Sequence, residues 1–199
     1  KTYDINQKAV EESKAFGCVP SAELEDVVAE RPDVIFTSLP TTAHGKLIAK
    51  HLLETGKLKP GSIWVDVTSG VPTEAREIAE MVEAAGVSYL DAGVAGGPNG
   101  ANTGTLSMMV GGKEDALSTV TPLLKLLSAP GKVTYLGPSG AGHAVKSVVC
   151  YIMLARGTHL LQTNTHLQAC CLVFGRFLLV FAMYVRNHCS LIQAYRRLC

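Results

Sequence analysis

Short runs of β-branched and aromatic residues alternate with helical patterns over most of the chain. Strands of this kind between amphipathic helices are typical of βαβ units, which assemble into a parallel sheet. The apolar runs predict strands over Lys1–Asp4, Val34–Ser38, Ile63–Val67, Ser88–Asp91, Leu106–Val110 and Val133–Leu136. We therefore expect an α/β fold with a doubly wound sheet that is mostly parallel and covered by helices on both faces.

The segments between these strands carry signals for helix ends. A hydroxyl or acidic residue favours the N-cap, proline favours the first turn, and a proline next to a glycine ends a helix. The predicted helices are Glu23–Glu30 after a Ser21 cap, Glu74–Ala85 after Pro72, and a helix that begins near Glu114 and stops at Pro130 and Gly131. Because open parallel sheets bind ligands beyond the carboxyl ends of their strands, the residues just after each strand are the candidates for a site.

Charge and cysteine are divided unevenly along the chain. Residues 1–146 contain 17 acidic and 13 basic residues, a net charge of −4, whereas residues 147–199 contain five arginines and no acid. The second segment also holds five of the six cysteines. Cys18, the sixth, is typical of a buried thiol in an intracellular protein, and the cysteines indicate no disulfide framework. We therefore distinguish a folded body, residues 1–146, from a Cys/Arg-rich hydrophobic tail, residues 147–199.

Two glycine-rich segments carry the candidate chemistry. Residues 91–112 read Asp-Ala-Gly-Val-Ala-Gly-Gly-Pro-Asn-Gly-Ala-Asn-Thr-Gly-Thr-Leu-Ser-Met-Met-Val-Gly-Gly, which predicts a strand, a loop and a strand. Residues 137–146 read Gly-Pro-Ser-Gly-Ala-Gly-His-Ala-Val-Lys. Glycine allows positive φ and close backbone approach, so both segments suit a ligand-facing loop, although glycine-rich turns also join strands where no ligand binds.

Both segments resemble signatures of the β-hydroxyacid dehydrogenases, the family of 3-hydroxyisobutyrate dehydrogenase, tartronate semialdehyde reductase and 6-phosphogluconate dehydrogenase. The first is similar to the family's substrate loop, with Gly93 in place of a proline and Ala95 in place of a serine. The second matches Gly-x-x-Gly-x-Gly-x-x-x-Lys at every glycine and at Lys146. The resemblance implies that residues 1–146 are part of a Rossmann-like dinucleotide-binding domain, without its first strand and phosphate-binding turn. No resemblance to the family's all-helical C-terminal domain is found.

The resemblance also implies a cofactor, NAD or else NADP. The residues that it places against this cofactor are Asp4, Asn6, Leu39, Pro40, His44 and Ser69. Asp4 would hold ribose hydroxyls at the end of the first predicted strand and favour NAD, because its charge repels a 2′-phosphate. Without the resemblance, an acid at a strand end is a common helix cap, His44 is typical of a surface residue, and a hydroxyl such as Ser69 before a helix is a routine N-cap.

By the same resemblance, Lys146 is the general acid and base. The substrate carboxylate is expected to bind at Ala95, Gly96 and Gly97. A lone lysine in the first turns of a helix would otherwise be a solvated residue. The family places asparagines three and four positions after the lysine, where Val149 and Cys150 stand here. These two changes and Ala95 each remove a hydrogen-bonding group from the expected site, which indicates impaired catalysis by the chain as written.

The function implied is hydride transfer between NAD(P) and a small 3-hydroxy acid such as 3-hydroxyisobutyrate. The alternative is a non-catalytic module that keeps the fold for binding or scaffolding, as the changed site residues suggest. The expected partner is a small-molecule 3-hydroxy acid, with no nucleic acid, no membrane and no metal. The resemblance also implies a homo-oligomer and the cytoplasm or the mitochondrial matrix as the compartment.

The tail, residues 147–199, does not resemble the family, and its composition is typical of a translated intron or a shifted reading frame. Residues 169–185 are apolar but contain Gly175 and Arg176, and an arginine in mid-span costs about 2.5–3.5 kcal/mol on insertion scales, which disfavours a membrane span. The cysteines and histidines lack the paired spacing of a zinc site, and the arginines form no nucleic-acid motif. The composition favours a disordered or aggregation-prone appendage.

Overall fold

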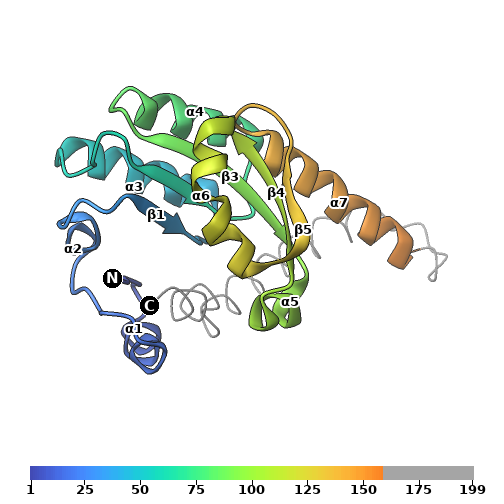
Figure 1. Ribbon diagram of the computed structural model, residues 1–199, viewed down its shortest axis with the longest axis horizontal. Coiled ribbons are helices and arrows are strands. Elements are labelled where there is room, and N and C mark those ends of the chain that lie inside the picture. Colours follow the sequence, from blue (N-terminus) through green and yellow to red (C-terminus); the bar gives the residue numbers. More distant parts are fainter. Residues whose placement is uncertain (159–199) are drawn as a thin grey trace.

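Five strands form one sheet in the computed structural model, which describes residues 1–158 (Figure 1). The strands lie side by side in chain order: β1 (Val34–Thr37), β2 (Ile63–Asp66), β3 (Ser88–Ala95), β4 (Leu106–Gly112) and β5 (Ser128–Tyr135). The helices are α1 (Gln7–Ser13), a 3₁₀ turn (Lys14–Phe16), α2 (Leu24–Val28), α3 (Thr42–Glu54), α4 (Pro72–Glu83), α5 (Gly97–Thr103), α6 (Glu114–Leu127) and α7 (Ala141–Thr158). The expected α/β fold is confirmed, since every strand pair except β3–β4 is parallel.

Helices cover both faces of the sheet, so each face has its own apolar core. On one face α3 and α4 bury side chains that include Trp64, Ile78 and Tyr89. On the other face α6 packs against β2 to β5 with its buried apolar side chains, which include Val120 and Leu124. The strands between them read as nearly continuous apolar runs because both of their faces are buried.

The antiparallel pair follows from the short connection between β3 and β4. Residues 96–105 join the two strands, and a parallel return needs a crossover of about a dozen residues or more. The sequence predicted that β3 ends at Asp91, but the strand continues to Ala95, which pairs with Ser107 of β4. The predicted loop is also wrong in part, because its centre forms the short helix α5.

The predicted strand over Lys1–Asp4 is not present. Its backbone makes only an isolated parallel bridge, in which the Thr2 amide donates to the Val19 carbonyl at 3.0 Å and the Ser21 amide donates to the Thr2 carbonyl at 2.8 Å. A strand needs a ladder of such bonds with a neighbour. Among the described residues the backbone of this segment pairs only with the chain near Pro20, which lies outside the sheet.

Two predicted helix ends are also corrected. Helix α2 is capped by Glu23, not by Ser21, and the Glu23 amide donates to the Asp26 carboxylate at 3.2 Å. Helix α6 already ends at Leu127, and Pro130 and Gly131 lie inside β5. The register with β4 shifts there, which is a bulge that tolerates a proline. The helix after Pro72 is confirmed, with proline in the first turn of α4.

Candidate functional site

The carboxyl ends of β1 and β2 carry two of the segments that the sequence assigned to a cofactor. Leu39 and Pro40 follow β1, and Ser69 follows β2. Because β1 and β2 are parallel neighbours, with Thr37 opposite Asp66, the two segments leave the sheet side by side. They lie at the edge where open α/β sheets bind ligands.

A buried carboxylate ties these two segments together. Asp66 is 1% exposed, and one of its oxygens accepts hydrogen bonds from the Thr37 hydroxyl (2.9 Å) and from the amide (3.1 Å) and hydroxyl of Thr68. Its other oxygen accepts from the Tyr89 hydroxyl at 2.8 Å. The Thr68 hydroxyl in turn accepts from the Leu39 amide at 3.0 Å. Burial and the neighbouring Asp66 charge raise the pKa of Tyr89, so its phenol stays a donor.

Ser69 is half-buried beside this carboxylate and is not a helix cap. The N-cap of α4 is Val71, whose amide donates to the Thr42 hydroxyl at 2.7 Å. Within the described residues the Ser69 hydroxyl has no hydrogen-bond partner. Ser69 thus stands at the edge where open α/β sheets bind ligands, and the capping alternative is excluded.

Lys146 is held in place by the start of α7, which docks on β3. The Asp91 carboxylate is fully buried and accepts from the amides of Gly140 (2.7 Å) and His143 (2.9 Å). Negative charge at a helix N-terminus is favourable, and here it comes from the sheet itself. Burial raises the pKa of Asp91, and the nearby His143 and the two amides oppose that rise. Gly142, the residue before His143, packs directly against backbone oxygens of β3 and β4.

The lysine stem fills the space above Gly93. A Cβ built on Gly93 would lie 2.6 Å from Cβ and 3.2 Å from Cγ of Lys146. Residues two apart in a strand face the same side, so Ala95 lies on the same face of β3 as Gly93. The structure therefore brings Lys146 and the beginning of the predicted substrate loop to one face of β3. In this structure the lysine stem occupies the space that a side chain at position 93 would fill.

The substrate-loop residues stand where β3 turns into α5. Ala95 ends the strand, and Gly96, with φ +135°, precedes Gly97 at the first position of the helix. A φ of +135° is a conformation that residues with a side chain rarely adopt. The glycine content of this segment thus serves a sharp strand-to-helix turn, whose outer residues, such as Gly96, are exposed.

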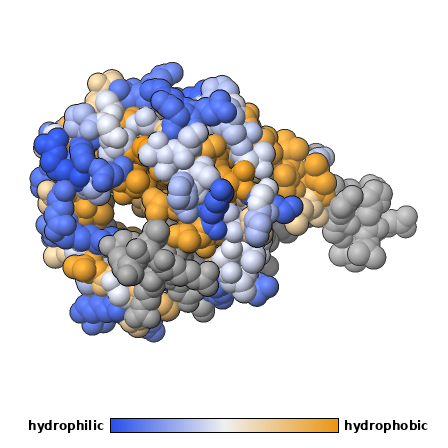
Figure 2. All heavy atoms as spheres, viewed as in Figure 1, coloured by the Kyte–Doolittle hydropathy of each residue, from blue (hydrophilic) through white to orange (hydrophobic). Residues whose placement is uncertain are grey.

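Val149 and Cys150 lie half-buried on α7, three and four positions after Lys146. They occupy one face with the lysine because such positions are neighbours on a helix. Beyond them α7 extends past the sheet, where apolar residues gather on its surface in Figure 2 and where Ile152 and Met153 are exposed. The polar amides of the family pattern are therefore replaced by an apolar side chain and a thiol.

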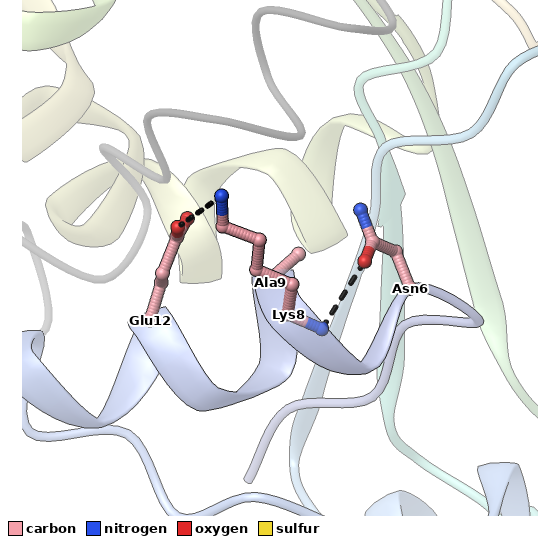
Figure 3. A pocket seen from close by; sticks show the side chains of 4 residues that line it. All are labelled: Asn6, Lys8, Ala9 and Glu12. Carbon is pink, nitrogen blue, oxygen red and sulfur yellow. Dashed lines mark hydrogen bonds and ion pairs between the residues drawn. The ribbon is translucent and has the colours of Figure 1, made fainter.

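Asp4 and Asn6 lie at the start of the chain, on the approach to α1. The Asp4 carboxylate accepts from the Asn6 amide at 2.8 Å, and the Asn6 side chain caps α1 by accepting from the Lys8 amide at 3.1 Å. Asn6 also lines a mostly polar hollow with Lys8, Ala9 and Glu12 (Figure 3). Both residues thus have local roles in the turn, and neither contacts the edge formed by β1 and β2 through a hydrogen bond.

His44 lies exposed in the first turn of α3. Its Nδ1 lies 2.8 Å from the Thr41 hydroxyl. The helix starts after Thr41, directly beyond Pro40, so His44 is on the same side of the sheet edge as the predicted cofactor segment. It is a surface residue near the edge.

Two buried carboxylates and a buried histidine at this site were not assigned by the sequence. Asp66 and Asp91 each end or follow an apolar run, and an acid inside such a run is the signal that marks a buried, hydrogen-bonded carboxylate. His143 is fully buried, and neither of its ring nitrogens has a partner among the described residues. No feature of the sequence distinguishes it from an exposed histidine.

Residues 169–185, the tail histidines and the tail cysteines other than Cys150 lie outside the described residues. Within residues 1–158, no helix is long and apolar enough to cross a membrane. In that same part of the chain, no group of three or more His, Cys, Asp or Glu side chains is arranged to hold a metal ion.

Comparison with known proteins gives one consistent match. The sequence model of the family described as "NAD binding domain of 6-phosphogluconate dehydrogenase" matches residues 1–137. A probable 3-hydroxyisobutyrate dehydrogenase of Mycobacterium tuberculosis is 33% identical over 153 residues, which are 76% of this chain and 49% of the relative. The mitochondrial 3-hydroxyisobutyrate dehydrogenase of Mus musculus is 35% identical over 156 residues, 76% of this chain and 44% of the relative.

A solved structure shows the same relation. The 3-hydroxyisobutyrate dehydrogenase of Mycobacterium tuberculosis with L-serine has a TM-score of 0.74 and 29% identity, over 88% of this chain and 56% of that one. The chain thus spans about half the length of the curated relatives that it matches.

Proposed function

The chain belongs to the β-hydroxyacid dehydrogenase family, and we propose that it supplies the cofactor-binding part of an enzyme that transfers hydride between NAD(P) and a small 3-hydroxy acid such as 3-hydroxyisobutyrate. One observation carries the proposal. Lys146 packs over Gly93 on the face of β3 where the substrate loop begins. A proton-transferring group and a carboxylate-binding loop belong together in such a reaction.

In this proposal the residues present have distinct tasks. When bound, NAD(P) would supply the hydride acceptor for oxidation of the substrate. The Nζ atom of Lys146 takes the hydroxyl proton as the hydride leaves and returns it in the reverse reaction. The Ala95–Gly97 turn holds the substrate carboxylate. Leu39, Pro40 and Ser69 line the cofactor at the carboxyl ends of β1 and β2.

We assign Asp4 and Asn6 to the ribose end of the cofactor and infer a preference for NAD, because the Asp4 carboxylate repels a 2′-phosphate. His44, exposed next to Pro40, is assigned to the rim of the cofactor site. The mouse relative is named as mitochondrial, which supports the mitochondrial matrix, beside the cytoplasm, as the compartment.

The observation that favours a non-catalytic module is the loss of polar groups next to Lys146. Ala95, Val149 and Cys150 offer no amide or hydroxyl to orient substrate or lysine. A missing hydrogen bond to a charged group costs about 1.5–3 kcal/mol, so several losses together lower the rate by orders of magnitude. This second candidate binds the cofactor without turning over a substrate.

The test joins residues 1–150 to the C-terminal half of the mouse relative, so that Val149 and Cys150 are retained, and measures NADH formation at 340 nm with 3-hydroxyisobutyrate. We expect activity that falls by about 10²- to 10⁴-fold in Lys146→Ala, the range for removal of a general acid and base. Lys146→Arg is the matched control, because it keeps the charge and not the proton transfer.

The two candidate functions predict different results when the missing polar side chains are restored. The triple variant Ala95→Ser, Val149→Asn and Cys150→Asn should raise the rate of the joined protein if the site is catalytic. Cofactor binding with no turnover in this variant would establish the non-catalytic module. Absence of both binding and turnover would refute both candidates.

A further inference from the structure

The Asp66 network consists of Trp64, Thr37, Asp66, Thr68 and Tyr89 and ends on the amide of Leu39. It begins in the core, where the Trp64 indole N–H donates to the Thr37 hydroxyl at 2.9 Å, and it reaches the sheet edge through Thr68. An ionised carboxylate is costly to bury unless donors surround it. Asp66 receives four hydrogen bonds from three residues, so its position is fixed by several elements at once.

The network has two limbs with different destinations. One limb, Tyr89 and Trp64, stays in the core, where the two rings meet edge to face with centroids 6.2 Å apart. The other limb leaves the core, because the Thr68 hydroxyl donates to Asp66 and accepts from the Leu39 amide. This second limb anchors the segments Leu39–Pro40 and Thr68–Ser69 to a single carboxylate.

We propose that Thr68 is a positioning residue for the cofactor, which holds the Leu39–Pro40 backbone and Ser69 at the spacing that the nicotinamide end of the cofactor requires. The inference rests on the proposed function. A ligand that must contact two loops binds more tightly when the loops are held in place beforehand, because less freedom is lost on binding. Without the Thr68 hydroxyl, the Leu39 amide loses its acceptor, and the two loops lose the side-chain link between them.

Three variants separate this role from a general contribution to stability. Thr68→Val keeps the shape and removes the hydroxyl, whereas Thr68→Ser keeps the hydroxyl. Tyr89→Phe removes a hydrogen bond from the same carboxylate on the core limb, away from both loops, and is the control for stability. Since Trp64 is the sole tryptophan of the chain, energy transfer from its indole to NADH reports binding directly.

We expect Thr68→Val to weaken NADH binding by about tenfold, the effect of one hydrogen bond of about 1.4 kcal/mol. Thr68→Ser should stay within about twofold of the unaltered chain, and Tyr89→Phe should lower the melting temperature while leaving NADH affinity within about twofold. Equal NADH affinity in all four proteins would overturn the inference, and so would a loss in Tyr89→Phe as large as in Thr68→Val.

Hydrogen exchange of the Leu39 amide tests the same point without a variant. In the unaltered chain, saturating NADH should slow exchange at Leu39 and at Ser69 together, whereas slowing at neither would overturn the inference. If the unaltered chain binds no NADH at all, the proposed function fails, and the cofactor role of Thr68 fails with it. That outcome is distinct, because failure of the inference alone leaves NADH binding intact.

Discussion

Replacing Gly142 by alanine should destabilise the protein by about 2 kcal/mol or more, although alanine is favoured over glycine in helices. A Cβ built on Gly142 would lie 2.2 Å from the Asp91 carbonyl oxygen and 2.4 Å from that of Met109. Both atoms belong to the backbone of paired strands and cannot rotate away. Helix α7 must therefore move off the sheet.

The magnitude follows from opposing contributions. Alanine gains about 1 kcal/mol over glycine inside a helix. Overpacking of a buried position costs about 1–3 kcal/mol, with the upper end expected here because both contacts are with fixed atoms. Movement of α7 also lengthens the bonds from the Gly140 and His143 amides to Asp91, and such charge-assisted bonds contribute about 1.5–3 kcal/mol each. The sum is a net loss of about 2 kcal/mol or more.

Gly45 provides the matched control. It is also buried in a helix, but a Cβ there would lie 3.4 Å from the Ile78 Cδ1 atom and 3.7 Å from the Leu39 Cδ1 atom, which are the ends of flexible side chains. Gly45→Ala should therefore gain up to about 1 kcal/mol from helix propensity. The same change from glycine to alanine should therefore lower the free energy of unfolding at position 142 and raise it at position 45.

The assay is urea unfolding followed by Trp64 fluorescence, with thermal unfolding as a second measurement. For a protein of this size about 1 kcal/mol corresponds to about 2–4 °C in melting temperature, so Gly142→Ala should lower it by about 4–8 °C. A Gly142→Ala protein as stable as the unaltered chain would refute the docking of α7 on β3, and a Gly45→Ala protein that loses as much stability would show that the loss at Gly142 does not depend on its contacts with β3 and β4.

Two further predictions concern β3. Gly93→Ala should cost about 1–3 kcal/mol in urea unfolding, because the added Cβ would lie 2.6 Å from Cβ of Lys146, and an unchanged midpoint would show that the lysine stem is elsewhere. Because burial raises the folded-state pKa of Asp91, its contribution to stability is full below the unfolded pKa of about 3.9 and is lost as the pH rises through the folded value. The unfolding free energy of the unaltered chain should thus fall relative to that of Asp91→Asn as the pH rises above about 4, and a pH-independent difference would contradict this sign.

Several elements were predictable because their signals are local. The strands β1 and β2 end within one residue of the apolar runs that predicted them, and α4 starts at the proline that marks its first turn. Long apolar runs and proline positions act through neighbours in the sequence, so they require no knowledge of the fold. The elements that were wrong depend on partners far along the chain.

The first predicted strand, Lys1–Asp4, shows this dependence. Its residues have strand character, yet a strand exists only where a neighbour completes its hydrogen bonds, and here the neighbour is a short stretch near Pro20. Likewise Pro130 and Gly131 are local helix breakers, but the helix ends earlier because β5 begins to pair with β4 at Ser128. Pairing over long distances overrides local preference.

The sequence by itself determined the family, the α/β architecture and the residues that carry the proposed chemistry, because glycine spacing and apolar periodicity are written along the chain. Only the tertiary structure decided how those residues are held. Contacts between distant segments place Lys146 over Gly93 and the Asp91 carboxylate under α7, and they join Leu39 to Thr68 through one hydroxyl. Such contacts depend on the distance between atoms in space, which the order of residues does not record.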